Sequence, residues 1–196
     1  MESLPFGRRN FGFGGPPLVR GDRLYAAVMT SPLVERECWV ICLDAATGAV
    51  KWCTSVASAP PRSPRQAPTS VVSLAEEDGT VVLLTNFGAI AALDSATGAF
   101  EWLATYDRTP SIRLAASPPV ISGSVVHVLP QDSEEPLSFD RWTGQKIALA
   151  RKTPQIPWSE IVHLLGQVEG WVVFSGAKNV AFRPSDGEAI LLADSD

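Results

Sequence analysis

The sequence predicts an all-β protein made of four repeated units, each with four antiparallel strands. Three observations indicate this class. A nine-residue turn motif recurs at intervals of 50, 46 and 43 residues, and short apolar runs preceded by glycine recur in phase with it. The 196 residues also include 15 glycines and 16 prolines spread along the chain, which is typical of many short strands joined by turns.

The turn motif is complete in two copies. The segment from Asp44 to Trp52 reads DAATGAVKW, and the segment from Asp94 to Trp102 reads DSATGAFEW. The third copy has Ala148 in place of the tryptophan, and the fourth lacks both the aspartate and the tryptophan, with Leu191 at the last position. We expect the aspartate to cap the turn, the glycine to adopt a positive φ, and the tryptophan to pack against the neighbouring unit. The predicted structural positions are Asp44, Gly48, Trp52, Asp94, Gly98, Trp102, Asp140, Gly144 and Gly187.

A second signal places the other strands. A glycine (Gly21, Gly79, Gly123 or Gly170) precedes an apolar run ahead of each turn motif, so each unit reads as strand A, turn, strand B, loop, strand C, turn, strand D. Four strands in about 45 residues is the size of one β-propeller blade. We expect one domain over residues 1–196, with blades at about 16–53, 67–104, 117–150 and 161–193. In this alignment His127 takes the place of Tyr25, Leu83 and Phe174, where it is expected to pack in the sheet.

The repeated turn with its tryptophan resembles the tryptophan-docking motif of quinoprotein-like (PQQ-like) β-propellers, and the resemblance extends over about residues 16–192. It implies a propeller of four-stranded antiparallel blades. It also implies two kinds of function, because these propellers include quinone-dependent dehydrogenases as well as non-catalytic bacterial scaffold and sensor domains. Members of this kind are periplasmic or extracytoplasmic, although no signal peptide is visible in this chain. Closed members have seven or eight blades, so the chain is a fragment, a half-ring that pairs with a copy of itself, or a small closed ring.

Catalysis is not expected. The resemblance implies that an enzymatic member would hold its quinone with two adjacent cysteines beside a Ca²⁺ site, but Cys38, Cys42 and Cys53 are not adjacent. They are expected to pack in strands, with a Cys42–Cys53 disulfide as the alternative. The recurrent aspartates are explained by their turns, and Phe11-Gly-Phe-Gly-Gly-Pro16 is expected to form a turn with two packed phenylalanines and not a phosphate loop. We therefore predict no catalytic residue, no cofactor and no metal ligand.

The expected function is a non-catalytic scaffold or sensor module that binds a protein or another macromolecule; the alternative is a fragment of a PQQ-dependent dehydrogenase. The net charge of −5 gives no reason to expect nucleic-acid binding, and no apolar run approaches the roughly 18 residues that span a bilayer. Expected partners are a protein or further blades, with self-association through uncovered blade faces. Binding residues concentrate on loops. The long loops carry a possible basic patch or merely scattered charge: Arg62, Arg65, Arg108, Arg113, Arg151 and Lys152.

Overall fold

The computed structural model describes residues 11–30, 36–59, 71–85, 87–109, 115–148, 156 and 158–192. All sheets in this part of the chain are antiparallel, and its one helical element is the short 3-10 turn η2 (Trp158–Glu160). The prediction of an all-β fold made of four repeated sheets is therefore confirmed.

The first sheet has one strand more than predicted. Its order is β1-β3-β4-β5, and β2 pairs with β3 beside β1. Both β1 and β2 pair with the same long strand, so they are the two halves of one interrupted strand A. The strands of this sheet are β1 (Phe11–Phe13), β2 (Leu18–Arg20), β3 (Arg23–Thr30), β4 (Arg36–Asp44) and β5 (Val50–Ala59).

The other three sheets have four strands each, hydrogen-bonded in chain order. The second sheet contains β6 (Ser73–Glu77), β7 (Thr80–Leu84), β8 (Ala89–Asp94) and β9 (Phe100–Thr105). The third contains β10 (Val120–Ser122), β11 (Val125–Val128), β12 (Leu137–Asp140) and β13 (Lys146–Ile147). The fourth contains β14 (Ile161–Val168), β15 (Trp171–Gly176), β16 (Asn179–Arg183) and β17 (Glu188–Leu192).

The chain divides into two compact units, Met1–Thr105 and Tyr106–Asp196. The first unit holds the first and second sheets, and its core lies between them, with apolar side chains of β3, β4 and β5 packed on those of β7 and β8. The second unit holds the third and fourth sheets, and its core contains Leu129 after β11 together with β14, β15 and β16. Apolar side chains thus join two consecutive sheets within each unit.

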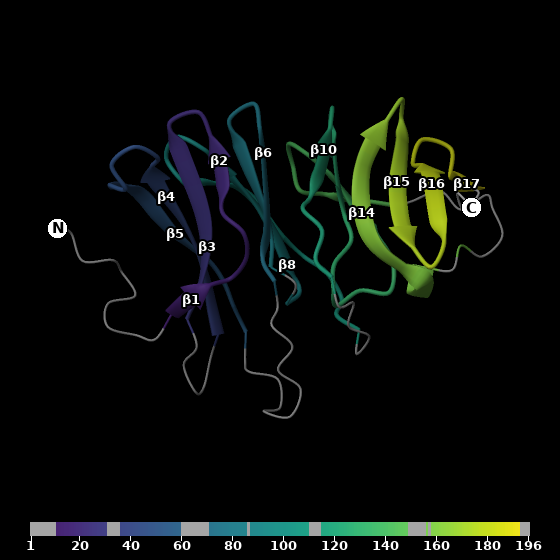
Figure 1. Cartoon of the computed structure of the whole chain (residues 1–196), viewed down its shortest axis with the longest axis horizontal. Coiled ribbons are helices and arrows are strands. Elements are labelled where there is room, and N and C mark those ends of the chain that lie inside the picture. Colours follow the sequence, from purple (N-terminus) through teal and green to yellow (C-terminus); the bar gives the residue numbers. More distant parts are fainter. Residues whose placement is uncertain are drawn as a thin grey trace. The chain divides into compact units, whose positions relative to one another are not determined.

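The hairpin between strands A and B and the hairpin between strands C and D lie at the same end of a sheet, because consecutive strands run in opposite directions. In the first sheet the backbone N–H of Ala45 donates to the carbonyl of Asp22, which ties the β4–β5 turn to the β2–β3 turn (Figure 1). The same bond joins Ser95 to Gly79 in the second sheet and Arg141 to Ser124 in the third. We call this the turn end of a sheet and the opposite end the loop end.

The interruption of strand A explains why one prediction was wrong. Residues 11–13 form β1 and not a turn, and the side chains of Phe11 and Phe13 are 49% and 72% exposed where buried rings were expected. The break falls at Gly14 and Gly15, because the chain there passes against the second sheet. The N–H of Val72 donates to Gly14 O at 2.7 Å, and a Cβ on Gly15 would lie 2.0 Å from Val72 O.

The alignment of the hairpins between strands A and B was off by one residue in two of the four units. Gly21 and Gly123 are the first residues of their turns, but Gly79 and Gly170 are the second, after Asp78 and Glu169 with φ near +49°. The strand register therefore places His127 at the position of Tyr25, as predicted, but aligns it with Val82 and Val173 in the other sheets.

A β-bulge after the turn changes which residue of the last strand lies on the docking face of the sheet. In the first two sheets the pairing slips by one residue, so that Trp52 lies opposite Cys42 and Trp102 lies opposite Ala92. The third and fourth sheets have no register shift in this hairpin. The positions that match the tryptophans there are Ile147 and Ile190, and not Ala148 and Leu191 as counting from the glycine predicted.

The cysteines are free thiols. Cys42 faces the core between the first and second sheets, whereas Cys53 packs on the opposite face of the first sheet with Ala26, Val28 and Ile41. Because neighbouring residues of paired strands alternate between faces, the alternative of a Cys42–Cys53 disulfide does not hold in this structure. Burial raises the pKa of Cys38 to about 12.

Candidate functional site

The turn aspartates hold their own hairpins. Oδ1 of Asp44 accepts hydrogen bonds from the N–H of Ala46 (3.2 Å), the N–H of Thr47 (2.9 Å) and the hydroxyl of Thr47 (2.8 Å). The N–H of Gly48 then donates to Asp44 O, with Gly48 at a φ of +71°. The Thr47 hydroxyl, its N–H and the Lys51 ammonium lower the pKa of Asp44 to about 2. The carboxylate is thus committed to the turn and stays ionised.

The second and third turns repeat this arrangement. Asp94 accepts from Thr97 at 2.7 and 2.6 Å, and Asp140 accepts from Thr143 at 2.9 and 2.8 Å. The threonine hydroxyl and then its N–H lower the pKa of each carboxyl. The fourth turn, without this aspartate, is held by Arg183, whose guanidinium pairs with Asp186 at 2.8 Å and also contacts Glu188. Each of the four turns therefore has a local structural explanation.

Trp52 docks on the next sheet, as predicted. Its side chain is buried, and its Nε1 donates to Ser95 O at 3.0 Å. The ring covers Gly98 so closely that a Cβ there would lie 2.5 Å from Cε3 of Trp52. Thr54, two residues further along β5, donates its hydroxyl to Gly98 O at 2.7 Å. Gly98 is thus required twice, once for its φ of +72° and once for the approach of the indole.

Two further side chains of the first sheet reach the same carbonyl. The guanidinium of Arg23 donates to Ser95 O, and the hydroxyl of Tyr25 approaches it at 3.4 Å. The rings of Tyr25 and Trp52 lie 5.9 Å apart in a tilted arrangement. Three side chains at the turn end of the first sheet therefore contact the turn after Asp94 in the second sheet.

The other tryptophans of the motif region differ in exposure. Trp102 is buried like Trp52. Trp142 lies within the third turn and is 62% exposed, with the guanidinium of Arg141 4.8 Å above its ring. Trp142, inside its turn, is therefore far more exposed than Trp52 and Trp102 on their strands.

His127 lies in the second unit, on the face that packs against the fourth sheet. It is buried, and its Nδ1 lies 2.8 Å from the hydroxyl of Ser138. Burial lowers its pKa to about 4, so the imidazole is neutral near pH 7. The gap around it is closed by Val172, Phe174 and Phe182 and has no room for a water molecule. The arrangement fits the predicted packing role, because a reactant has no space beside the ring.

The loop end of the second unit has a buried acidic residue that the sequence analysis missed. Asp132, in the connection between β11 and β12, accepts hydrogen bonds from the hydroxyl of Tyr106 (2.8 Å) and from Nε of Arg108 (3.0 Å). Its backbone carbonyl accepts from the N–H of Thr109. The cluster fixes the segment before β10 against this loop. The repeat offered no signal for it, because no equivalent aspartate recurs in the other units.

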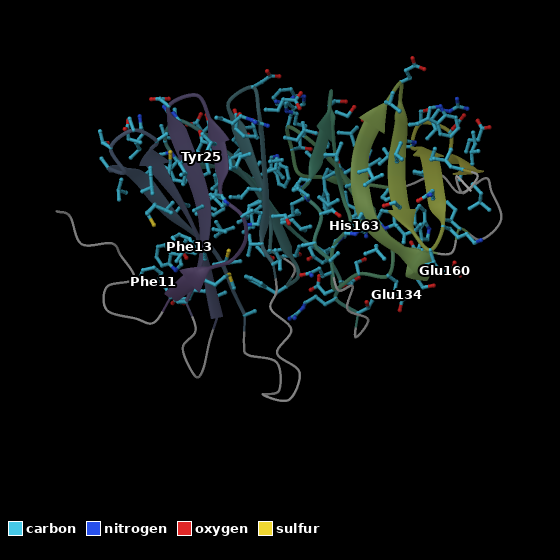
Figure 2. The ribbon with its side chains drawn as sticks, viewed as in Figure 1. Phe11, Phe13, Tyr25, Glu134, Glu160 and His163 are labelled. Carbon is cyan, nitrogen blue, oxygen red and sulfur yellow. The ribbon has the colours of Figure 1, made fainter. Side chains whose placement is uncertain are left out.

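Of the six residues in the predicted basic patch, the structure describes only Arg108. Arg108 is an exposed residue whose guanidinium pairs with Asp132, and the other five candidates lie outside the described residues: Arg62, Arg65, Arg113, Arg151 and Lys152. The described loop end of the second unit instead carries exposed acidic side chains, Glu134 and Glu160 (Figure 2). His163 lies in β14 and is exposed. The basic patch therefore stays a prediction.

The described residues contain neither a metal-binding cluster nor a membrane-spanning helix. Within these ranges, no three His, Cys, Asp or Glu side chains gather in a way that could hold a metal ion. Nor does this part of the chain contain a helix with the length and apolar character needed to cross a membrane.

Comparison with known families and structures agrees with this geometry. Residues 9–168 match the family model described as outer membrane protein assembly factor BamB. No curated protein sequence matches the chain. Among solved structures, BamB from Moraxella catarrhalis is 18% identical with a TM-score of 0.58, and the match covers 85% of this chain and 49% of BamB. The chain thus spans about half the length of that relative.

Two other structural matches mark the range of the fold. The quinohemoprotein alcohol dehydrogenase from Comamonas testosteroni is 18% identical with a TM-score of 0.58, and the match covers 91% of this chain and 34% of the enzyme. The computationally designed protein Ika4 is 15% identical with a TM-score of 0.54, and there the match covers 97% of this chain and 94% of the design. At these identities the likeness concerns the fold.

Proposed function

The chain belongs to the PQQ-like β-propeller family described as outer membrane protein assembly factor BamB, and on that premise we propose that it is a non-catalytic, protein-binding propeller module. The alternative is a fragment of a PQQ-dependent dehydrogenase. The family contains proteins of both kinds by name, so the choice depends on what the side chains of this chain do.

The observation that supports the proposal is that the recurrent aspartates use their carboxylates to hydrogen-bond their own turns. Oδ1 of Asp44, of Asp94 and of Asp140 each accepts three hydrogen bonds from its own hairpin. A general base must instead present its carboxylate to a substrate. The second of these turns also receives the indole of Trp52 from the first sheet at Gly98. These acids therefore serve the scaffold.

The loop end is the surface we assign to the partner. In the second unit it is built on a rigid cluster, because the carboxylate of Asp132 is buried and bound by Tyr106 and Arg108. Glu134 and Glu160 project from this end with exposed side chains. Loops held by a rigid scaffold are the usual location of binding residues. An extended polypeptide is the partner class that the description of an outer membrane protein assembly factor suggests.

A peptide array tests the proposal. The full chain is applied to 15-residue peptides that tile an unfolded outer-membrane β-barrel protein, and hits are titrated by fluorescence anisotropy. We expect saturable binding that changes roughly fivefold or more in Glu134→Gln/Glu160→Gln, which raises the net charge by two, since exposed charges tune recognition at a binding surface.

The matched control places two positive charges at the turn end of the same unit, in Gln145→Lys/Ser185→Lys, where both native side chains are exposed. This variant is expected to bind as the native chain does. No saturable binding to any peptide, or an equal effect of the two double variants, contradicts the proposal.

A further inference from the structure

The short strand β1 forms an open edge of the first sheet at its loop end. The N–H of Gly14 donates to Ala27 O at 2.8 Å, one position beyond the pair Phe13↔Val28. Backbone groups of alternate residues in an antiparallel ladder point to opposite sides of the strand, so the N–H and the C=O of Phe13 point away from β3. Neither group is hydrogen-bonded to a residue that the structure describes. The edge therefore presents one unused donor and one unused acceptor.

An apolar row of side chains lies beside this edge. Phe13 of β1 pairs with Val28 of β3, which pairs with Trp39 of β4, and cross-strand partners share a face. Val28 and Trp39 belong to the apolar cluster on the face away from the second sheet. Phe13 is 72% exposed, and Phe11, on the same face, is 49% exposed. Figure 2 shows both rings at the end of the sheet opposite to Tyr25.

The other edge strands of the described sheets are protected against added strands in the usual ways. A charged residue lies in each of β2, β5, β6, β9, β13 and β17, and β14 contains two register shifts. The strand β10 has neither feature, but it is half-buried and lies against β14. By contrast, β1 reads Phe-Gly-Phe, with no charge, no proline and no register shift. An exposed apolar edge of this kind is a template for pairing with another chain.

We propose that β1 binds an extended segment of a protein partner as an added antiparallel strand, with apolar residues of the segment beside Phe13 and polar residues at the alternate positions. The inference rests on the proposed function in taking a polypeptide as the partner, and it adds the mode of binding and a site in the first unit. The occupant follows from the edge, because an N–H and a C=O that point outward from one residue are matched by the C=O and N–H of one residue in a second strand.

The geometry of the pair also determines which residues of the segment matter. In an antiparallel hydrogen-bonded pair, the residue opposite Phe13 places its side chain on the same face as the phenyl ring. The residues of the segment that bond to the β1 backbone are therefore the same residues whose side chains contact the apolar row. A segment that alternates apolar and polar residues meets both requirements at once, whereas a reversed alternation meets only one.

Peptides with methylated backbone nitrogens test this mode of binding. The probe is a ten-residue peptide of four Val-Thr pairs between two terminal lysines, titrated against the full chain by NMR. N-methylation of the four valines removes the N–H groups that face β1, and we expect it to weaken binding roughly tenfold or more. N-methylation of the four threonines removes the same number of N–H groups on the far side of the strand, and we expect the affinity to stay within about twofold of that of the unmethylated peptide.

Two substitutions at Phe13 form a matched pair. Phe13→Val and Phe13→Pro both remove the ring and introduce side chains of similar size, but only proline lacks the N–H that faces the added strand. This N–H takes no part in the ladder with β3, and proline is tolerated on the open side of an edge strand, so both variants should fold. Phe13→Val is expected to weaken peptide binding about threefold, and Phe13→Pro roughly tenfold or more. Circular dichroism compares the folding of both with that of the native chain.

Amide hydrogen exchange of the native protein, followed by NMR, locates the contact. In the free chain the Phe13 N–H is expected to exchange faster than the Gly14 N–H, which is bonded to Ala27 O. Saturation with the unmethylated peptide is expected to slow exchange at Phe13 roughly tenfold or more, because the added strand then accepts a hydrogen bond from this group.

Four outcomes overturn the proposal: no binding of the unmethylated peptide, equal effects of the two methylated peptides, equal affinities of Phe13→Pro and Phe13→Val, or a Phe13 amide that is already protected in the free chain. In the last case the chain itself or a second copy occupies the edge. The probe differs from the array peptides, so failure of the array contradicts the proposed function and leaves this test intact. Array peptides that bind Phe13→Pro as tightly as the native chain overturn the β1 site alone.

Discussion

At the scale of single residues, the structure explains why two glycines in nearly identical sequence contexts differ in how much the fold depends on them. Gly48 and Gly98 both follow Thr in a turn capped by aspartate, and both have φ near +70°. Only Gly98 lies under an indole, because Trp52 of the preceding strand reaches it. The repeat correctly predicted the positive φ and the burial of Trp52. It gave no indication of Thr54 or Ser95, because Ala104 stands at the Thr54 position in the second repeat and Ser95 contributes a backbone carbonyl.

Trp52→Ala should lower the free energy of unfolding by roughly 3–5 kcal/mol, because it removes a buried ring from the contact between two sheets. Trp142→Ala is the matched control, since that ring is 62% exposed, and we expect a change within about 0.5 kcal/mol. Urea denaturation followed by circular dichroism measures both. A loss below about 1 kcal/mol for Trp52→Ala would refute the docking role.

Gly98→Ala and Gly48→Ala form a second pair. Each puts a Cβ on a residue with positive φ, which costs about 1 kcal/mol. Only Gly98→Ala also pushes a Cβ into Trp52, and overpacking of this kind costs roughly 1–3 kcal/mol more. Thermal or urea denaturation should therefore rank Gly98→Ala as clearly less stable than Gly48→Ala. Equal stabilities would mean that the indole does not rest on Gly98 in solution.

His127 gives the fold a defined acid sensitivity. In the folded protein, burial lowers the pKa of His127 to about 4 from the ordinary value of 6.5. Above pH 6.5 the imidazole is therefore neutral in both the folded and the unfolded chain. As the pH falls from 6.5 towards 4, only the unfolded chain takes up the proton, and the free energy of unfolding decreases by up to roughly 3 kcal/mol. His127→Gln should lose this component between pH 6.5 and 4, whereas His163→Gln, at an exposed site, should keep it. A native pH profile identical to that of His127→Gln would contradict the assignment.

At the scale of elements, two of the departures from prediction have a clear physical cause. Counting from a turn glycine assumes a constant register, and the bulge beside Lys51 and Glu101 breaks that assumption in two sheets but not in the others. The bulged side chains have their own contacts, Lys51 with Asp22 at 2.8 Å and Glu101 with the hydroxyl of Thr80 at 3.0 Å. A bulge of this kind leaves little trace in a single sequence.

The second cause is the interrupted strand A of the first sheet. A run rich in glycine predicted a turn, but residues 11–13 continue the pairing with β3 and the break falls at Gly14 and Gly15. Gly15→Ala should destabilise the fold by roughly 2 kcal/mol or more, because its Cβ would meet a backbone carbonyl that cannot move alone. Gly12→Ala, with open space around it, should change stability by no more than about 0.5 kcal/mol. Differential scanning calorimetry separates the two, and equal melting temperatures would contradict the close approach of Val72.

At the scale of the whole molecule, the repeat predicted the four sheets because a period near 45 residues is a strong signal, and the structure confirms them. The functional surface was harder to predict. Only their charge marks the basic loop residues in the sequence, and the one that the structure describes, Arg108, pairs with the buried carboxylate of Asp132. The fold can therefore be predicted from residues that recur between repeats. A binding surface depends on residues that do not recur, so the repeat does not predict it.

The central claim is that this propeller module binds protein and does not carry quinone chemistry. Isothermal titration of the full chain with pyrroloquinoline quinone in the presence of Ca²⁺ tests it most directly. Since the recurrent carboxylates are held by their own turns and the three thiols are apart along the chain, we expect no saturable heat at quinone concentrations up to about 100 μM. Stoichiometric binding at micromolar affinity, with dye-linked oxidation of an alcohol by the loaded protein, would contradict the account and establish the dehydrogenase alternative.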